Sequence, residues 1–282
     1  MKVMRIIGIL SLLTLPLASS CSWPTKYAHL QAYDEATPPG REVTLRAKLE
    51  YRGHLLFRLD IHRQKINFLV NDEYAGSALT GRDGTAQLKY TPEAAGVLNV
   101  RAAIDKSSRY TAPVARALLL CAEPDDRFIV TDIDQTIAYS TIISSLFLRA
   151  ERCPVVRGSP EVMARLAGKY KIIYVTGRDD STLEGTRAWL RVRGFPEGPV
   201  FIRDMNIFNL SRAKFKRALF GELMGRGINI VAAFGNRGHD VRAARTHAIP
   251  VILIRRSGED GDGVFYARDW SEVEQTLATL AE

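Results

Sequence analysis

The sequence predicts two domains of different class, an all-β sandwich over residues 41–122 and an α/β domain over 126–282. Short apolar segments with a period of two fill the first range, whereas apolar runs alternate with helical patterns in the second. A polar break, Glu123–Asp126, separates them. The chain has 282 residues, of which 46% are hydrophobic, and this is enough for two hydrophobic cores.

The first domain is predicted from six short segments that are rich in β-branched or apolar residues. They are EVTLRAKLEY, HLLFRLDI, KINFLV, TAQLKY, VLNVRAAI and PVARALLLCA. Turn signals such as Gly81–Gly84 separate them, and a domain of about 80 residues with regularly spaced strands resembles a small immunoglobulin-like sandwich. We predict no catalytic group here and interpret His54, Asp60 and His62 as solvent-facing. Residues 21–40 lack periodicity and end in Pro-Pro-Gly, which predicts a linker.

The first twenty residues (1–20) have the pattern of an export signal. Lys2 and Arg5 precede an apolar run, Ile6–Leu17, which is shorter than the roughly 20 residues that a membrane span needs. Small residues then lead to Cys21, as in a bacterial lipobox, although alanine stands three residues before it, where leucine is usual. We expect Cys21 to be lipidated; the alternative is ordinary cleavage before an unmodified Cys21.

Composition narrows the classes of partner. The net charge of +8 falls to +6 when Lys2 and Arg5 are removed (8 − 2). The remaining positive charge favours anionic partners such as phosphates or acidic lipid surfaces; the alternative is that it only keeps the protein soluble. No basic run is dense enough to predict nucleic-acid binding, and no later segment is long and apolar enough to span a membrane. We therefore expect an exported protein of the cell envelope, either a membrane-anchored lipoprotein or a free periplasmic protein.

Two cysteines, Cys121 and Cys153, remain after Cys21. In an oxidising compartment they could pair, and because they lie on either side of the first strand of the α/β domain, a bridge would brace the loop after that strand. The alternative is two buried apolar side chains. We predict that they pair, and the lack of a CxxC pattern argues against structural zinc.

The second domain reads as strands alternating with helices. The segments are FIVTD, PEVMARLAGKY, KIIYVT, TLEGTRAWLRVRG, PVFIRD, RAKFKRALFGELMGRG, INIVAAFG, DVRAARTHA and PVILI. Ser159 and Pro160 form a helix start, and Gly194 a helix end. Such alternation predicts right-handed βαβ units, and therefore a parallel sheet with helices on both faces.

Polar residues follow the ends of these predicted strands. They are Asp132, Asp134 and Thr136, then Thr176, Gly177 and Arg178, then Asn236 and Asp240, with Lys214 and Lys216 opening a helix. In a parallel sheet the carboxyl ends of the strands meet at the ligand-binding edge. Two close carboxylates stay ionised only beside a cation, and Mg²⁺ prefers oxygen ligands and phosphate-bearing substrates. A lysine, a strand-end hydroxyl and the open backbone of Gly177 would bind a phosphoryl group.

The order of these motifs is similar to that of the haloacid dehalogenase (HAD) phosphatase superfamily. Within it, FGNRGHDVRAARTHAIP resembles the signature of lipin-type (LNS2) and actin-patch-type phosphatidate phosphatases, as do KFKRALFGEL and RGFPEGPVFIRD. The resemblance covers about 127–256 and none of the β domain, and Gln135 stands where many relatives have glycine. It implies an α/β HAD-like fold and Mg²⁺-dependent chemistry through an aspartyl-phosphate.

Carried over to this chain, the resemblance implies a role for each residue of the site. Asp132 would be the nucleophile and a metal ligand, and Asp134 the general acid/base, ligating through its backbone carbonyl. Asn236 would ligate the metal, and Asp240 would ligate it or lie just behind the ligands.

Phosphate binding is implied for Thr176, and the open backbone of Gly177 suits the same task. For the lysine we favour Lys216, because buried positions follow it at helical spacing, with Lys214 as the alternative. Arg178, Asp179 and Asp180 either line the entrance or start the next helix.

The forty residues between Thr136 and Thr176 (176 − 136) leave little room for a cap, which predicts an open site. The apolar segment 141–150 is either a buried helix or a lipid contact. We therefore expect a phosphomonoesterase acting on phosphatidate or another lipid phosphate, with the membrane reached through Cys21. The alternatives are a periplasmic phosphatase of soluble or protein phosphoesters, and a non-catalytic envelope lipoprotein that binds a partner.

Overall fold

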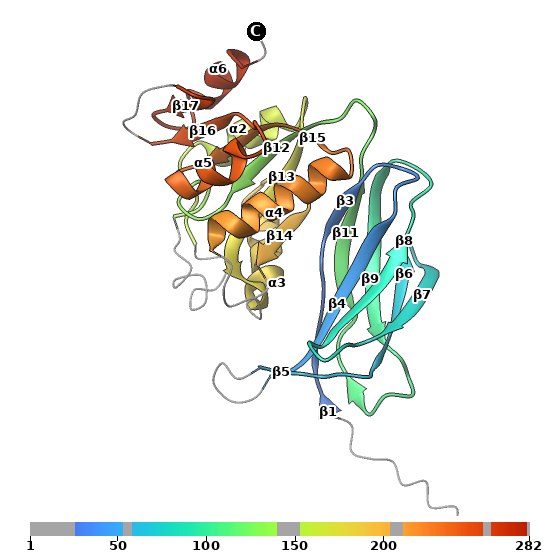
Figure 1. Ribbon diagram of the computed structural model, residues 1–282. Helices are drawn as coiled ribbons and strands as arrows, with labels where there is room; N and C mark the ends of the chain where they lie inside the picture. Colours follow the sequence, from blue (N-terminus) through green and yellow to red (C-terminus); the bar gives the residue numbers. More distant parts are fainter. Residues whose placement is uncertain (1–25, 53–57, 140–152, 204–210, 256–260, 281–282) are drawn as a thin grey trace, which may run out of the picture.

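The computed structural model describes residues 26–52, 58–139, 153–203, 211–255 and 261–280 (Figure 1). They form a β-sandwich followed by an α/β domain, as predicted. The export signal, Cys21 and the apolar segment 141–150 lie outside the described residues. Among the described residues, no helix has the length and apolar character to cross a membrane.

The N-terminal domain is a sandwich of two main sheets. One has the strand order β3-β11-β9-β6-β7; in the other, β4 pairs with β2, β5 and β8. The strands are β1 Lys26–Tyr27, β2 His29–Ala32, β3 Glu35–Thr37, β4 Val43–Arg52, β5 Arg58–Asp60, β6 Lys65–Val70, β7 Glu73–Leu79, β8 Thr85–Tyr90, β9 Gly96–Ile104, β10 Tyr110–Thr111 and β11 Ala115–Cys121. Alternate residues face inward, such as Leu45, Ala47 and Leu49 on β4, because successive side chains of a strand point to opposite faces.

The predicted linker at 21–40 is wrong for residues 26–37. These residues form β1, β2 and β3, and the last two belong to the sandwich: β2 pairs with β4, and β3 runs parallel to β11, with Ala36 opposite Leu120. The side chains of β3 are buried. The sandwich therefore begins before the predicted boundary at residue 41. Strand β7 was also missed by the sequence prediction.

The second domain contains a six-stranded sheet in the order β14-β13-β12-β15-β16-β17, in which every pairing is parallel. Its strands are β12 Arg127–Asp132, β13 Lys171–Asp179, β14 Val200–Arg203, β15 Asn229–Gly235, β16 Val251–Ile254 and β17 Val264–Ala267. The chain runs from β12 outward to β13 and β14, then returns to β15 on the other side of β12. The ends of β12, β13 and β15 thus form the switch point where such sheets bind ligands.

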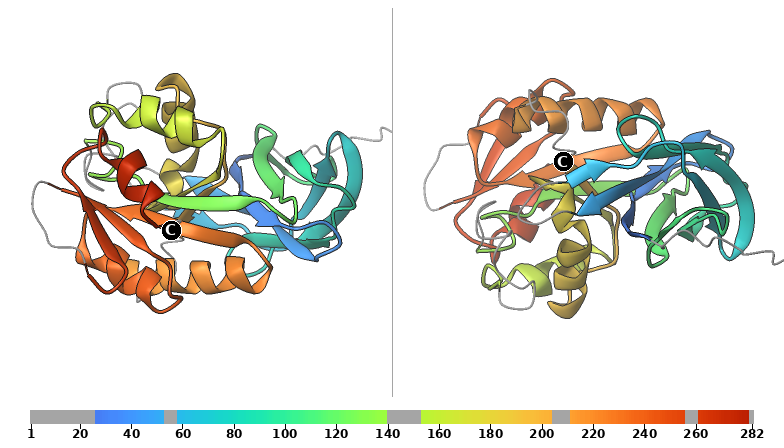
Figure 2. Two further views of the ribbon diagram at one scale, coloured as in Figure 1. Left: turned by 90° about the horizontal axis from the view of Figure 1, so that it is seen from above. Right: turned by 90° about the horizontal axis from the view of Figure 1, so that it is seen from below.

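Helices cover both faces of this sheet (Figure 2). They are α2 Ser159–Leu166, α3 Leu183–Val192, α4 Arg212–Gly225, α5 Gly238–Arg245 and α6 Val273–Ala278, with the short 3-10 helix η2 Asp180–Thr182 before α3. Side chains of α2, α3 and α6 share one core cluster with Ile129, whereas those of α4 and α5 share another with Phe128 and Val130. Successive residues of β12 thus point to opposite faces of the sheet, and both faces are covered, as expected of a buried parallel strand.

The predicted disulfide between Cys121 and Cys153 is wrong: both cysteines are free and buried. Cys153 belongs to the core cluster on the α2 face of the parallel sheet, whereas Cys121 is the last residue of β11, a strand of the sandwich. The two cysteines are therefore buried in different domains. They are the two buried apolar side chains of the alternative interpretation.

Buried ion pairs join the two domains. The carboxylate of Asp34 accepts hydrogen bonds from Leu118 N of its own domain (2.7 Å) and from Val200 N of the other (2.8 Å), and it pairs with Arg187 of α3 (2.6 Å). Glu35 pairs with Arg226, which follows α4, at 2.8 Å. Each contact gives a buried carboxylate of the sandwich a hydrogen-bond donor or a positive charge from the α/β domain, and buried polar groups need such partners.

Candidate active site

The loop after β12 carries the first two aspartates. Asp132 is the last residue of β12, and the loop that follows turns back so that Ala138 N donates to Ile133 O (3.0 Å). Ile133 and Ile137 are fully buried and fix the loop on the core. The indole of Trp270 donates to Thr136 O at 2.9 Å and fixes it from the C-terminal side. Trp270 was not predicted, because it lies outside the motifs.

Gln135 occupies a special backbone position in this loop. Its φ is 64°, in the left-handed region that glycine adopts without cost and other residues adopt at about 1 kcal/mol. Gln135 therefore stands where glycine is physically favoured, and the loop keeps the conformation that glycine would give. Gln135 N donates to Ala138 O at 2.8 Å, which helps to hold that conformation.

Asp132 is a buried carboxylate with two direct partners. Lys216 Nζ pairs with its Oδ1, and Thr136 Oγ1 donates to its Oδ2 at 3.2 Å. Only 7% of Asp132 is exposed. Burial raises the pKa of Asp132 to about 6, against the opposing effect of the Lys216 ammonium. The site therefore holds a carboxylate that gains from any additional positive charge.

Lys216 joins Asp132 to Asp240. Its ammonium lies 2.7 Å from Asp240 Oδ1, and the lysine is 2% exposed, whereas Lys214 lies on the exposed side of α4. Burial alone would lower the pKa of Lys216, but the two carboxylates raise it, so the ammonium stays charged. Of the two candidate lysines, the structure places Lys216 beside the predicted nucleophile.

Asp240 is held at the start of α5 and in turn supports Lys216. Its Oδ2 accepts from Asn236 N (3.2 Å) and Arg237 N (3.1 Å), which makes it the acidic partner of a helix-capping arrangement. Although burial opposes ionisation, Lys216 and the adjacent His239 lower the pKa of Asp240. Two roles were predicted for Asp240, a metal ligand or a residue just behind the ligands. This geometry favours the second.

Asp134 faces residues from the end of β13. Thr176 Oγ1 donates to its Oδ2 at 3.1 Å, and the Arg178 guanidinium reaches it through Nε (3.1 Å to both oxygens) and Nη2 (2.9 Å to Oδ1). The pairing of β13 with β14 skips from Thr176 to Asp179, so Gly177 and Arg178 form a bulge. A bulge redirects side chains, and here it places Arg178 in the site. The sequence reasoning had left this role open.

Asn236 offers an oxygen ligand that suits a hard metal ion. Asn236 follows β15, and its side-chain Oδ1 is buried without a hydrogen-bond partner among the described residues. A buried carbonyl oxygen without a partner costs free energy unless a donor or a cation occupies its lone pairs. The described residues hold no group of three His, Cys, Asp or Glu side chains suited to a metal. The resemblance to HAD phosphatases implies that a metal here would be held by Asp132, the Asn236 amide oxygen and the Asp134 backbone carbonyl.

The predicted residues thus converge on one edge of the sheet. Lys216 pairs with Asp132 and Asp240, and Thr176 is hydrogen-bonded to Asp134. Gly177 lies beside the site, where an added Cβ would come within 3.0 Å of the Arg212 side chain. Between Thr136 and Thr176 the described residues contain one helix, α2.

Comparisons with known proteins agree with this arrangement. Residues 129–251 match the family model described as PITM 1-3, LNS2 domain. The match includes every predicted site residue of the sheet edge and none of the β-sandwich. A search of curated proteins gave no match.

Three solved structures are similar over one domain each. A chain of the Pnkp1/Rnl/Hen1 RNA repair complex shares 20% identity over 47% of this chain and 44% of that chain, with a TM-score of 0.41, so this chain spans less than half of its length. A HAD-superfamily hydrolase of subfamily IA from Geobacter sulfurreducens PCA shares 12% identity over 54% and 96%, with a TM-score of 0.37. A fibronectin(III)-like module of Clostridium thermocellum CbhA shares 10% over 33% and 94%, with a TM-score of 0.23.

Over residues 129–251 the α/β domain of this chain is therefore similar to LNS2 domains, and its strand order and strand-end aspartates are consistent with that similarity.

Proposed function

We propose that the protein is a Mg²⁺-dependent phosphomonoesterase that acts on phosphatidate or another lipid phosphate at a membrane surface. The observation that carries the proposal is the position of Asp132. It is a buried carboxylate at the end of β12, fixed by Lys216 and Thr136. The adjacent strand β15 leads to Asn236, whose amide oxygen has no hydrogen-bond partner among the described residues. This combination suits a nucleophile that attacks phosphorus.

The residues divide the chemistry between them. A carboxylate oxygen of Asp132 attacks phosphorus and forms an aspartyl-phosphate, while the phosphorus–oxygen bond to the alcohol breaks. Asp134 donates a proton to the departing alcohol and later takes one from the water that hydrolyses the aspartyl-phosphate. The Arg178 guanidinium and the Thr176 hydroxyl orient Asp134 for both transfers.

Positive charge stabilises the phosphoryl group as its negative charge redistributes. Lys216 supplies a fixed ammonium on Asp132, and Asp240 keeps it there. Mg²⁺, when bound to Asp132, Asn236 and the Asp134 carbonyl, would supply further charge for the phosphoryl oxygens.

The lipid substrate is supported by the LNS2 match and by features of the chain. The segment before the β domain has the pattern of a lipidated export signal ending at Cys21. Acyl chains on Cys21 would tether the enzyme, because each buried CH₂ contributes ~0.8 kcal/mol. The expected charge of +6 (8 − 2) after signal removal would favour an anionic surface, at about 1 kcal/mol for each nearby basic residue.

The test is a comparison of kcat/KM for phosphatidate in mixed micelles with that for small soluble phosphomonoesters, each with and without Mg²⁺. The control is Asp132→Asn, which we expect to lower turnover by ~10³-fold or more because the amide cannot attack phosphorus. Equal or better turnover of the soluble compounds would favour the periplasmic alternative. A wild-type protein without activity on any of them would favour the non-catalytic binding lipoprotein.

The metal is tested separately at Asn236. We expect Asn236→Ala to shift the midpoint of a Mg²⁺ titration to higher concentration more than it lowers the rate at saturating metal, because it removes one oxygen ligand and no reacting group. An unchanged midpoint would show that Asn236 is not a ligand.

A further inference from the structure

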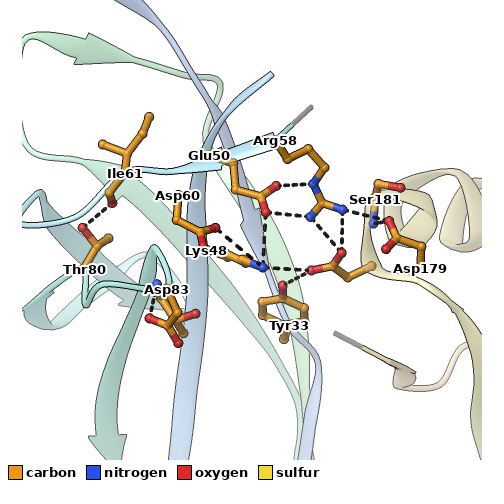
Figure 3. Close-up of polar contacts among 12 residues, drawn as sticks. Tyr33, Lys48, Glu50, Arg58, Asp60, Ile61, Thr80, Asp83, Asp179 and Ser181 are labelled. Carbon is orange, nitrogen blue, oxygen red and sulfur yellow. Dashed lines mark hydrogen bonds and ion pairs between the residues drawn. The ribbon is translucent and has the colours of Figure 1, made fainter. Parts of the chain in front are cut away.

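A cluster of charged side chains joins the β-sandwich to the phosphatase domain next to the active site (Figure 3). Arg58, the first residue of β5, pairs with Asp179 (2.8 Å) and with Asp180 (2.8 Å) of the α/β domain. Its guanidinium also binds Glu50 on the neighbouring strand β4 through Nε (2.8 Å) and Nη2 (2.7 Å). One arginine thus connects a rigid strand pair to two consecutive residues of the other domain.

The sandwich supplies further partners to Asp180. Tyr33 Oη donates to its Oδ2 at 2.8 Å, and Lys48 Nζ lies 3.7 Å from the same oxygen. Asp180 is fully buried and Lys48 is 2% exposed. Charges buried this deeply have strong geometric preferences, since few other arrangements would satisfy them. The position of Asp180 is therefore set by the β-sandwich.

Asp179 and Asp180 directly follow the bulge that places Arg178 in the active site. The bulge lacks the regular pairing to β14 that fixes the rest of β13, because the register resumes only at Asp179. Asp179 caps η2 by accepting from Ser181 N at 2.9 Å. The segment is thus anchored at Thr176 on one side and at the Arg58 contacts on the other, with Arg178 between the two anchors.

We propose that Arg58 is a positioning residue of the phosphatase: the β-sandwich, through Arg58, holds Asp179 and Asp180 so that Arg178 stays on the carboxylate of Asp134. The proposal rests on the role proposed above for Asp134 as general acid/base. It gives the N-terminal domain a part in the reaction, although none of its described residues contacts the predicted nucleophile.

Simple adhesion between the domains does not require Arg58. Asp34 with Arg187, and Glu35 with Arg226, join the domains at other points, and neither pair lies in the bulge segment. The two roles make different predictions. Loss of adhesion would impair every substrate alike, whereas a displaced Asp134 slows formation of the aspartyl-phosphate mainly for substrates whose leaving oxygen needs a proton.

The experiment measures kcat and KM of Arg58→Ala on two soluble phosphomonoesters, p-nitrophenyl phosphate and glycerol phosphate. The nitrophenolate leaves without taking up a proton, whereas the glycerol oxygen must be protonated as it leaves. We expect kcat/KM, which reports the steps up to formation of the aspartyl-phosphate and not its hydrolysis, to fall by about 10- to 100-fold for glycerol phosphate, as for a small misplacement of a catalytic group. For p-nitrophenyl phosphate we expect kcat/KM to fall by less than about 3-fold. Arg58→Lys should recover part of the loss, because an ammonium can hold one of the two carboxylates.

The matched control is Arg226→Ala, which removes an arginine between the domains but leaves the bulge segment untouched. It should leave the ratio of the two kcat/KM values at the wild-type level. If Arg58→Ala does not fold, Asp180→Asn tests the same contact with little change in side-chain size. We expect it to lower kcat/KM for glycerol phosphate relative to that for p-nitrophenyl phosphate. An equal loss on both substrates, or none, would overturn the proposal and leave the proposed function standing. A wild-type protein that hydrolyses neither substrate nor phosphatidate would overturn the proposed function as well.

Discussion

Gly235, the last residue of β15, offers a direct test of how Asp240 supports the site. An added Cβ at Gly235 would lie 2.6 Å from Cβ, Cγ and Oδ2 of Asp240. Ordinary contact begins near 3.4 Å, so Gly235→Ala requires Asp240 to move by at least 0.8 Å (3.4 − 2.6). The backbone of Gly235 is outside the left-handed region, and the effect of alanine is therefore steric.

The displacement has a calculable consequence for Lys216. Its 2.7 Å contact with Asp240 would lengthen to about 3.5 Å (2.7 + 0.8) if the carboxylate moved straight away, which is the limit of a hydrogen bond. Overpacking costs about 1–3 kcal/mol, and a hydrogen bond between charged groups contributes about 1.5–3 kcal/mol. We expect Gly235→Ala to lower the free energy of unfolding by about 2–4 kcal/mol and to reduce phosphatase turnover.

The measurement is urea unfolding together with kcat, and the control is Gly185→Ala. Gly185 lies within α3, is exposed, and has no atom within 4 Å of its added Cβ. Alanine there should stabilise the protein by about 0.5–1 kcal/mol, since glycine is unfavourable inside a helix. If Gly235→Ala matched this control in stability and the wild type in turnover, Asp240 would not be fixed by the contacts described.

Three further predictions concern single residues. In the absence of metal, Lys216→Met should cost about 3–5 kcal/mol of unfolding free energy, because it leaves Asp132 without its buried partner; the exposed Lys214→Met should stay within about 0.5 kcal/mol in the same urea titration. Gln135→Gly should keep turnover and change stability by no more than about 1 kcal/mol, since relief of the positive φ offsets the added freedom of the unfolded chain; a large loss of turnover would give the glutamine side chain a role of its own. Burial raises the pKa of Asp180 in the folded protein above its ordinary value of 3.8. The contribution of the protonated carboxyl to stability is therefore present at low pH and is lost as pH rises through the pKa in the folded protein. In urea unfolding from pH 4 to 7 the wild type should lose stability relative to Asp180→Asn, and parallel pH curves for the two proteins would contradict this.

Much of the site could be predicted because it follows the ends of regular strands. Asp132, Thr176 and Asn236 each come after an apolar run, and the geometry of parallel sheets brings such ends together. The role of Arg178 could not be predicted in this way, because it depends on a bulge that leaves no periodic signal. The buried position of Lys216 was predictable from the helical spacing of Leu219, Phe220 and Leu223, which share its face.

The errors in the fold have a common physical cause. Strands β2 and β3 are too short to show a period, and each is fixed by partners distant in the chain, as Ala36 is by Leu120. Strand β7 contains Gly76 at a φ of 145°, where no regular β pattern predicts a strand. The cysteine pairing failed because the sequence does not reveal that Cys121 ends a strand of the sandwich, whereas Cys153 is buried in the core of the α/β domain.

The carboxylate of Asp34 has a consequence for how this protein could have been assembled in evolution. Its oxygens accept hydrogen bonds from backbone N–H groups of both domains, Leu118 on one side and Val200 on the other, and from Arg187. A phosphatase domain transferred to another gene without the sandwich would carry an exposed Val200 N–H, and its Arg187 would keep Glu184 but lose Asp34. Exchange of either domain alone therefore requires compensating substitutions at this junction, and the two domains are expected to have been inherited together.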